Sequence, residues 1–235
     1  MLIALVMVPT YNESENIASL VKDILELNPS YGVVVVDDDS PDGTSTIVAE
    51  MQKNEHRVHL ITRKSSKGRG TAGIEGLLYA VRQDVPYIVE MDADYSHHPR
   101  HIPDLIVAME ICDVAIGSRS IEGGRTAGRG FLRQTITRFA NGFIRLIMGV
   151  PVSDCTAGFR CFKRKVLQSI NLENMVSSGP SIVEEILYAC HIRGFQIMEV
   201  PILFEDRVKG KSTKTFFQYA ETMLRIIQFR LTMKR

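Results

Sequence analysis

Residues 33–44 read Val-Val-Val-Val-Asp-Asp-Asp-Ser-Pro-Asp-Gly-Thr, and this stretch indicates the fold class. Four consecutive β-branched residues predict a strand that is buried on both faces, as in a parallel sheet covered by helices. The acidic and turn-forming residues after it predict a loop at the carboxyl end of the strand. A helix is expected to start at Thr44, so the stretch forms one strand–loop–helix unit of an α/β protein.

The same alternation of strand and helix extends over the first half of the chain. Ser14 is expected to cap the first helix, and Asn28-Pro29 to end it. Apolar runs predict strands over 2–8, 58–62, 87–91 and 114–116, and helical periodicity predicts helices over 17–25, 44–51, 71–82 and 102–111. The pattern predicts a Rossmann-like, open and mostly parallel sheet with helices on both faces.

The second half of the chain is less regular. We expect helices over 131–148, 182–192 and 216–233, strands over 158–163 and 196–204, and a polar loop over 208–215. The predicted organisation is one α/β domain over 1–210 and a C-terminal amphipathic helix over 211–235.

Charge is distributed in blocks that the near-neutral total conceals. The whole chain carries a formal charge of +1, which argues against a strongly basic nucleic-acid binder. Residues 1–118 carry a net charge of −9, residues 119–165 carry +8, residues 166–206 carry −5 and residues 207–235 carry +7. Such blocks suggest a site that handles both a cation and anions, although single charges usually lie on solvated faces.

The N-terminal apolar run and the spacing of the cysteines both favour a reducing compartment. The apolar run from Met1 to Val8 is far shorter than a membrane-spanning helix, and we interpret it as a buried first strand rather than a signal peptide. The four cysteines show neither Cys-x-x-Cys nor zinc spacing. We therefore expect reduced, buried thiols and a cytosolic protein.

Polar residues gather where the predicted strands end, the edge at which open α/β sheets bind ligands. Asp92-Ala93-Asp94 follows the strand over 87–91 and places two carboxylates near one point. Hard oxygen ligands suit Mg²⁺ or Mn²⁺ shared with a diphosphate, whereas a turn or capping role is the commoner fate of a single Asp-x-Asp. His97, His98 and His101 follow closely and are expected to be loop and helix-cap residues.

Two other strand ends carry candidate nucleotide contacts. Asp37-Asp38-Asp39 supplies acceptors for a base or a ribose, and Asp42 is expected to form the turn into the next helix. Tyr11 offers a ring for stacking on a base, or packs at the rim of the sheet. The glycines of Lys67–Gly73 match Gly-x-Gly-x-x-Gly, but they follow the third strand instead of the first, so a redox dinucleotide site is disfavoured.

Taken together and in order, these motifs resemble the inverting family-2 glycosyltransferases of GT-A fold, and more narrowly the dolichol-phosphate mannose synthases. The resemblance rests on Pro9–Glu13, Asp37–Thr44, Asp92–Asp94, Gly117–Arg119, Asp154–Arg160 and Glu199–Ile202. It covers almost the whole chain and assigns residues 1–210 to a GT-A glycosyltransferase domain.

The resemblance implies transfer of mannose from GDP-mannose to dolichyl or polyprenyl phosphate, which gives a β-linked lipid-phosphate sugar. Pro9, Tyr11, Glu13, Val36 and Asp38 would line the guanosine pocket, Asp92 and Ala93 would hold the donor, and Asp94, Asp92 and Ser96 would bind Mg²⁺ or Mn²⁺. Asp94, Arg119 and Arg133 would carry catalysis, with the two arginines on the acceptor phosphate, and Arg207 would contact the donor diphosphate. Arginine suits such anions because its planar fork donates paired hydrogen bonds.

Several positions depart from the pattern of that subgroup. Ser96 stands where glutamine is frequent, Arg129 where tryptophan is frequent, and Val183 where glutamine is usual. The Ser-Lys pair near the C-terminus becomes Ser212-Thr213-Lys214. Glu184 is expected on a solvated helix face, whereas Glu185 is left open as a base, a positioning group or a solvated residue.

Other functions remain open at this point. The same reaction with UDP-glucose or another nucleotide sugar is the first alternative, and a non-catalytic GT-A-like regulatory subunit is the second. Helices 131–148 and 216–233 carry apolar stripes that either pack on the sheet or lie at a membrane surface. A lipid acceptor would place the protein peripherally on the cytoplasmic face of a membrane, and some relatives recruit a small membrane subunit there.

Overall fold

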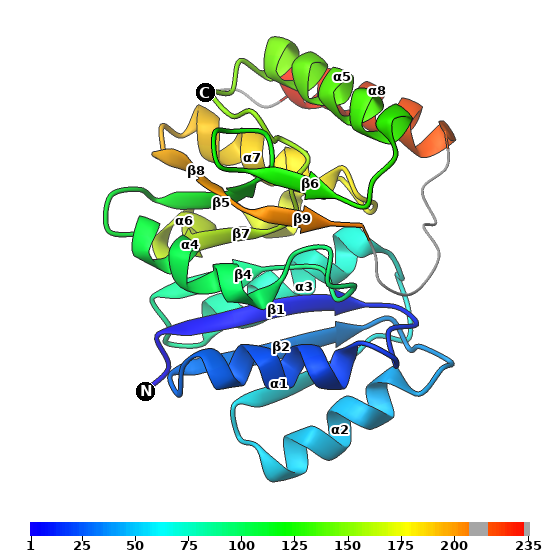
Figure 1. The fold of residues 1–235 in the computed structure, drawn as a ribbon, viewed down its shortest axis with the longest axis vertical. Helices are drawn as coiled ribbons and strands as arrows, with labels where there is room; N and C mark the ends of the chain where they lie inside the picture. The colour runs from blue at the N-terminus through cyan, green and yellow to red at the C-terminus, as the bar shows by residue number, and fades with distance from the viewer. Residues whose placement is uncertain (207–215, 233–235) are drawn as a thin grey trace.

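The computed structural model describes residues 1–206 and 216–232 and confirms the α/β sheet (Figure 1). The strands are β1 (Ala4–Thr10), β2 (Tyr31–Asp37), β3 (Val58–Thr62), β4 (Tyr87–Glu90), β5 (Val114–Ser118), β6 (Arg125–Ala127), β7 (Arg160–Lys163), β8 (Ile197–Pro201) and β9 (Leu203–Glu205). The helices are α1 (Ile17–Leu27), α2 (Thr44–Asn54), α3 (Arg69–Arg82), α4 (Ile102–Ala108), α5 (Phe131–Met148), α6 (Arg164–Ser169), α7 (Ile182–Ile192) and α8 (Phe216–Thr232), with 3₁₀ turns η1 (Pro99–His101) and η2 (Leu172–Asn174).

The central sheet has seven strands in the order β3-β2-β1-β4-β7-β5-β8. Its strand pairs are parallel except for those of β7, which lies antiparallel between β4 and β5. The strand predicted over 158–163 therefore exists, but it is inserted between strands that the βα repeat alone would make neighbours.

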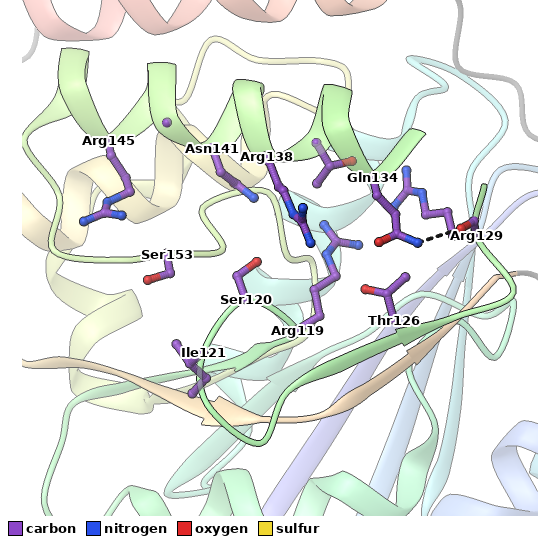
Figure 2. Close-up of a pocket in the computed structure, with 12 residues that line it drawn as sticks. Arg119, Ser120, Ile121, Thr126, Arg129, Gln134, Arg138, Asn141, Arg145 and Ser153 are labelled. Carbon is purple, nitrogen blue, oxygen red and sulfur yellow. Dashed lines mark hydrogen bonds between the residues drawn. The ribbon is translucent and has the colours of Figure 1, made fainter. Parts of the chain in front are cut away.

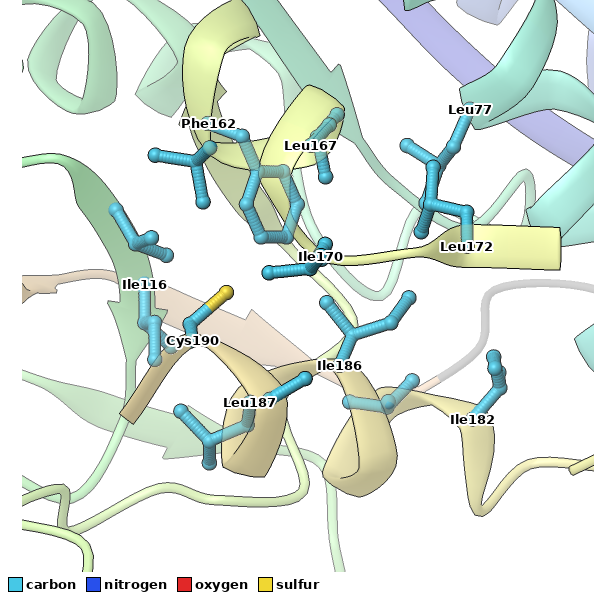
Figure 3. Packing of buried hydrophobic residues seen from close by; sticks show 14 of the residues in the cluster. Leu77, Ile116, Phe162, Leu167, Ile170, Leu172, Ile182, Ile186, Leu187 and Cys190 are labelled. Carbon is cyan, nitrogen blue, oxygen red and sulfur yellow. The ribbon is translucent and has the colours of Figure 1, made fainter. Parts of the chain in front are cut away.

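Helices cover both faces of the sheet and divide the core into two layers. Every residue of β2 is buried, as the run of valines predicts. In β1, Leu5 and Met7 face the layer formed with α3, α6 and α7, while Val6 and Val8 face α1 and α4. Figure 3 shows the first layer, where Phe162 of β7 and Ile186 of α7 pack among leucine and isoleucine side chains.

Two predicted boundaries are wrong. Ser14 does not cap α1, because Asn16 occupies the N-cap position and the backbone N–H of Ser14 donates to Asp42 Oδ2 at 2.9 Å. The strand predicted over 196–204 divides after Pro201 into β8, which pairs with β5, and β9, which pairs with β6 in a small separate sheet. Neither β6 nor α6 was expected from the sequence pattern.

Helices α5 and α8 pack against each other at one end of the sheet (Figure 1). Each turns some apolar side chains inward, including Ile144 and Phe229, which are buried. In the part of the chain that the structure describes, no helix combines the length and the hydropathy needed to cross a bilayer. The expected reduced state of the cysteines agrees with four buried free thiols, and burial raises the pKa of Cys155 and Cys190 to about 12.

Candidate active site

The carboxyl ends of β1, β2 and β4 meet at one edge of the sheet. Thr10 of β1 lies opposite Asp37 of β2, and Met7 of β1 lies opposite Glu90 of β4. The chain beyond these positions carries Asp38 and Asp92, so the parallel register brings the predicted nucleotide and metal residues to the same edge.

Adjacent aspartates in the loop after β2 have different roles. Asp37 accepts hydrogen bonds from Thr10 Oγ1 at 2.8 Å, from Ser40 and from Ser45, so it organises the loop. The buried Asp38 carboxylate binds the Arg63 guanidinium and accepts from the backbone N–H of Gly68 at 2.7 Å. Asp37 and Asp38 each accept from their own set of hydrogen-bond donors, and these interactions offset the repulsion between the two adjacent carboxylates.

The loop after β1 docks onto the loop after β2. The backbone N–H of Glu13 donates to Thr44 Oγ1 at 3.0 Å, and Tyr11 stays 56% exposed at the rim. Asp42 forms the turn into α2, as expected, and accepts from Thr44 and Ser14. Burial tends to raise the pKa of Asp42, but these hydrogen bonds outweigh it and lower the pKa.

Pro9 and Val36 lie on the strands beneath these loops. Pro9 is half-buried in β1, whereas Val36 is fully buried and packs in the core layer shared with α3. A Cβ added to Gly76 of α3 would lie 2.7 Å from Val36 Cγ2, so this glycine lets the helix approach the strand closely. The Val36 side chain therefore packs against α3 in the core.

The Asp92-Ala93-Asp94 segment presents its two carboxylates differently. The Asp92 side chain is 38% exposed, whereas Asp94 and Ala93 are buried. Asp94 Oδ1 accepts from the backbone N–H of Ser96 at 3.1 Å, and the buried Ser96 hydroxyl lies 3.4 Å from His97 Nδ1. All the candidate metal-ligating atoms of Asp92, Asp94 and Ser96 are oxygens, which suit Mg²⁺ or Mn²⁺.

These residues fit a metal ion that is bound together with a substrate. Within residues 1–206 and 216–232, no group of three or more His, Cys, Asp or Glu side chains is placed to hold an ion. An ion at Asp92 and Asp94 would take its remaining ligands from Ser96, water and a bound anion such as a diphosphate. Mg²⁺ in particular is usually bound in this shared manner.

We refer to the strand ends that carry Asp38, Asp92 and Asp94 as the acidic edge. Arg69, the first residue of α3, connects this edge to the sheet. Its Nη1 donates to Glu90 Oε1 at 2.6 Å and its Nη2 to Asp92 Oδ1 at 3.1 Å. Burial tends to lower the pKa of Arg69, but the two carboxylates outweigh it and raise the pKa. The guanidinium therefore stays charged beside a predicted metal ligand.

The glycine motif at the start of α3 provides close packing. A Cβ at Gly70 would lie 2.5 Å from Ser177 O and 2.6 Å from Gly179 O, so only glycine lets α3 approach that loop. Glu185 holds the same loop, because it accepts from the backbone N–H groups of Val176 and Ser177 at 2.9 Å each. Glu185 is therefore a positioning residue.

Glu184 does not lie on a solvated face of α7, and that expectation is wrong. Its side chain is buried, as is every residue from Ile182 to Cys190. The helix lies between the core layer of the sheet and the helix α8 that packs over it. An apolar stripe predicts that one face of a helix is buried, and it does not show that a second element also covers the opposite face.

His97 lies between the acidic edge and Arg119. It is buried, stacks on Phe159 at 5.4 Å and contacts Phe204 edge-on at 5.3 Å. Burial lowers its pKa, Asp92 opposes that shift and Arg119 adds to it, so the imidazole is neutral near pH 7. His97 is thus a packed residue of the site rather than a loop residue, whereas His98 caps η1 as expected.

Arg119 is held by a buried carboxylate at the end of β5. Its Nε lies 3.0 Å from Asp154 Oδ2, and its Nη2 donates to Asp154 Oδ1 and to Thr156 Oγ1 at 3.1 Å each. Asn141 of α5 also donates to Asp154, at 3.3 Å. Glu199 fixes this loop because it accepts from the backbone N–H groups of Ser153 and Asp154, at 2.8 and 2.9 Å.

A cavity of about 430 Å³ opens between α5 and the loop after β5 (Figure 2). Four arginines line it, together with polar and small residues: Arg119, Arg129, Arg138 and Arg145, with Ser120, Ile121, Thr126, Gln134, Thr137, Asn141, Gly142 and Ser153. In Figure 2, Arg138 points from α5 toward Arg119, which rises from the opposite wall. We refer to this cavity as the arginine pocket.

The structure brings together most of the predicted site residues but not all of them. Arg133 does not line the arginine pocket; its side chain is 59% exposed and lies 3.3 Å from Asp206. Arg207 and the Ser212-Thr213-Lys214 segment lie outside the described residues.

Sequence reasoning missed Arg63, Arg69 and Arg138. Arg63 and Arg69 flank the loop after β3, and their position at a strand end beside acidic loops was an available signal. Arg145 follows Arg138 by seven residues on α5, a spacing that places both on one helix face.

The fold and the site define a class of enzyme. An open α/β sheet with an Asp-x-Asp sequence at a strand end, next to an arginine-lined pocket, is the arrangement of a GT-A glycosyltransferase. The chain belongs to glycosyl transferase family 2, whose family model matches residues 5–170.

Similar proteins of known activity cover nearly all of the chain. It is 35% identical over 227 residues to the polyprenol monophosphomannose synthase of Mycolicibacterium smegmatis, across 96% of this chain and 86% of the relative. It is 33% identical over 208 residues to the undecaprenyl-phosphate mannosyltransferase of Micrococcus luteus, across 88% and 86%.

A solved structure agrees on the fold at lower sequence identity. Glucosyl-3-phosphoglycerate synthase from Mycobacterium tuberculosis, in complex with Mn²⁺, uridine diphosphate and phosphoglyceric acid, superposes with a TM-score of 0.70. It is 18% identical and covers 99% of this chain and 79% of that chain. At this identity the likeness establishes the GT-A fold and leaves the substrates open.

Proposed function

We propose that this glycosyltransferase moves mannose from GDP-mannose to a polyprenyl phosphate. The arginine pocket beside the acidic edge carries the proposal. The Arg119 guanidinium lies 4.6 Å from the centre of the Phe204 ring, and His97, three residues after Asp94, contacts the same ring at 5.3 Å. A site with cationic and anionic sides suits a reaction that joins two anionic substrates. The polyprenol-phosphate chemistry named for the two similar mannosyltransferases supports this assignment.

The proposed acceptor is already a nucleophile. A phosphate monoester is ionised at neutral pH, so its oxygen needs no strong general base. In the proposed step, an acceptor phosphate oxygen forms a bond to the anomeric carbon while the bond from that carbon to the diphosphate breaks, and GDP leaves. Attack from the face opposite the leaving group gives inversion and a β-linked product.

Each side of the site has a part in this step. Asp38 and the loops after β1 and β2 would bind the nucleoside, and Asp92 and Asp94, with Ser96, would hold Mg²⁺ or Mn²⁺. A bound divalent ion would stabilise the negative charge of the leaving diphosphate. Arg119, oriented by Asp154, would bind the acceptor phosphate, and Arg129, Arg138 and Arg145 would supply further positive charge in the pocket.

A lipid acceptor also requires contact with a membrane. Large apolar side chains are exposed on both α5 and α8: Phe131, Leu132, Ile136, Phe139 and Leu146 on α5, and Leu224, Ile227 and Leu231 on α8. The α5 residues lie on the helix that forms one wall of the arginine pocket. We propose that these residues rest on the cytoplasmic surface of a membrane and bring the pocket to the lipid headgroup.

One assay tests the reaction. The purified chain is incubated with Mn²⁺ or Mg²⁺, undecaprenyl phosphate and radiolabelled GDP-mannose or UDP-glucose, and label is measured in the extracted lipid. We expect metal-dependent label from GDP-mannose and loss of label with EDTA. Label from UDP-glucose alone would replace the proposed donor. No label with any nucleotide sugar would overturn the enzyme proposal and favour a regulatory GT-A-like subunit.

A further inference from the structure

Arg69 forms a bridge that involves one of the two predicted metal ligands. Its two terminal nitrogens bind different carboxylates, Glu90 at 2.6 Å and Asp92 at 3.1 Å. Glu90 is fully buried on β4, whereas the Asp92 side chain is 38% exposed at the strand end. A single guanidinium thus links a core carboxylate to a carboxylate of the site.

The surroundings of Glu90 keep the arginine in place. Glu90 Oε2 is buried and has no hydrogen-bond partner among the residues that the structure describes, and Glu90 Oε1 accepts from Arg69. The buried Arg160 interacts electrostatically with Glu90, but its guanidinium donates to three backbone carbonyls instead. Removing the guanidinium would leave a buried carboxylate without its hydrogen-bonded cation, which is strongly unfavourable.

Gly158 closes the other side of the bridge. A Cβ at this position would lie 3.1 Å from Arg69 Nη2 and 3.5 Å from an Asp92 carboxylate oxygen. The backbone of the loop before β7 therefore packs directly over the Arg69–Asp92 contact. The contact is a constrained feature of the site, since Arg69 is fixed by Glu90 below it and covered by Gly158.

We propose that Arg69 masks Asp92 until a nucleoside diphosphate binds, and so couples the binding of the metal to that of the donor. This inference rests on the proposed metal site at Asp92 and Asp94. A fixed cation hydrogen-bonded to a metal ligand repels a divalent ion and occupies a carboxylate oxygen. A diphosphate attracts both the ion and the guanidinium, so its arrival offsets that repulsion. Arg69 is then a positioning residue that acts through Asp92.

The proposal has a direct thermodynamic consequence. Because coupling between two ligands is reciprocal, Mn²⁺ and GDP should each strengthen the binding of the other. Loss of the Arg69 charge should strengthen Mn²⁺ binding in the absence of nucleotide and weaken the coupling. A residue that merely supported the fold would weaken Mn²⁺ binding or leave it unchanged.

The test is a titration of the protein with Mn²⁺, followed by the electron paramagnetic resonance signal of the free ion, with and without GDP. For Arg69→Leu we expect Mn²⁺ alone to bind about tenfold more tightly, since a unit charge a few ångströms from the site is removed. The enhancement of Mn²⁺ affinity by GDP should fall by a similar factor. Weaker or unchanged Mn²⁺ binding by this variant would overturn the proposal.

Two further variants separate the charge effect from misfolding. The double variant Arg69→Leu/Glu90→Leu removes both buried partners and so leaves no unpaired buried charge. Because the negative charge of Glu90 is lost together with the positive charge of Arg69, its affinity for Mn²⁺ alone should lie between those of wild type and Arg69→Leu. Arg164→Leu removes an equivalent charge from a pair with Asp84 at 2.7 Å, distant in the sheet from Asp92, and should leave both affinities unchanged.

The outcomes also distinguish this proposal from the proposed reaction. The titration needs no sugar and no acceptor, so a different donor sugar leaves it intact, and UDP replaces GDP in a parallel arm. Wild-type protein that binds Mn²⁺ with normal coupling, beside an unchanged Arg69→Leu variant, overturns only the masking role. Wild-type protein that binds no Mn²⁺, even with nucleotide, overturns both the masking role and the proposed metal site.

Discussion

The acidic edge and the arginine pocket each hold an arginine with carboxylates, but they are built in different ways. The acidic edge comes from successive βα units, whose strand ends converge because the strands are parallel neighbours. The arginine pocket joins segments far apart in the chain, from Arg119 through α5 to Ser153. The first is a product of regular repetition, and the second depends on one long helix that closes over the sheet.

The carboxylates that hold the two arginines also differ. Asp154, beside Arg119, has a side chain that is 1% exposed and accepts from several donors, so it serves the structure of the pocket. Asp92, beside Arg69, is 38% exposed and remains accessible to a ligand. The buried Asp154 thus holds Arg119 in one position, whereas the exposed Asp92 leaves its carboxylate open to the proposed metal ion.

The largest effect is expected at the acidic edge. Asp94→Asn should lower kcat for mannosyl transfer by about a thousandfold, because the charge of the proposed metal ligand beside the leaving diphosphate is lost. Asp104→Asn, at an exposed carboxylate in the first turn of α4, is the matched control and should retain activity. Steady-state kinetics at saturating Mn²⁺ measure both; substantial transfer by the Asp94 variant would remove this residue from the metal site.

The next effect concerns the carboxylate that holds the pocket. Asp154→Asn should lower the free energy of unfolding by about 3 kcal/mol, since Arg119 loses its buried ion-pair partner. It should also reduce kcat/KM for the acceptor by about a hundredfold, the upper end for residues that orient others. Chemical denaturation and acceptor kinetics provide the measurements.

Asp113→Asn serves as the control for the Asp154 variant, because Asp113 pairs with Lys163 and Lys165 away from the pocket. It should leave kcat/KM for the acceptor unchanged. If both variants lower kcat/KM for the acceptor equally, the proposal that Asp154 orients Arg119 for acceptor binding is wrong.

A smaller effect distinguishes two arginines of α5. Arg138→Ala should raise the acceptor KM by about tenfold, as expected for a lost hydrogen bond to a charged group. Arg133→Ala removes an equal charge one turn earlier, from a residue that lies outside the pocket and pairs with Asp206. Kinetics with varied polyprenyl phosphate compare the two variants; a larger effect at Arg133 would restore it as the main phosphate contact.

The smallest effect compares a glycine from each region. Gly70→Ala should destabilise the protein by about 2 kcal/mol, because the added methyl overpacks against the backbone at residues 177–179. Gly142→Ala, on α5 with open space around its Cα, should stabilise it by about 0.5 kcal/mol through helix propensity. Urea denaturation measures both, and equal effects would refute the close-packing role of the glycine motif.

The regular half of the fold was predictable because local pattern and tertiary structure agree there. The valines of β2 and the alternating faces of β1 already specify a buried parallel sheet. The antiparallel insertion of β7 was not predictable, because a short apolar run does not indicate which strands it pairs with. Pro201 was a signal for the break between β8 and β9, since proline cannot donate to a strand ladder.

The candidate site was predictable where its residues follow strand ends. Asp38, Asp92 and Asp94 lie where the strand pattern puts them. The bridge of Arg69 to Glu90 depends on how α3 lies on β4. Glu184 is buried on α7, where it interacts electrostatically with the buried Arg160 of β7, so no local pattern reveals either feature. Tertiary contacts of this kind are decided by packing between elements distant in sequence.

The most direct test of the central claim is a pair of binding measurements on the same variants. Calorimetry would measure GDP binding in the presence of Mn²⁺, and separately the binding of farnesyl phosphate, a short polyprenyl phosphate, to wild type, Asp94→Asn and Arg138→Ala. We expect Asp94→Asn to lose GDP binding and keep farnesyl phosphate binding, and Arg138→Ala to keep GDP binding and bind farnesyl phosphate about tenfold more weakly. Parallel loss of both ligands in both variants would contradict a division of labour between the acidic edge and the arginine pocket.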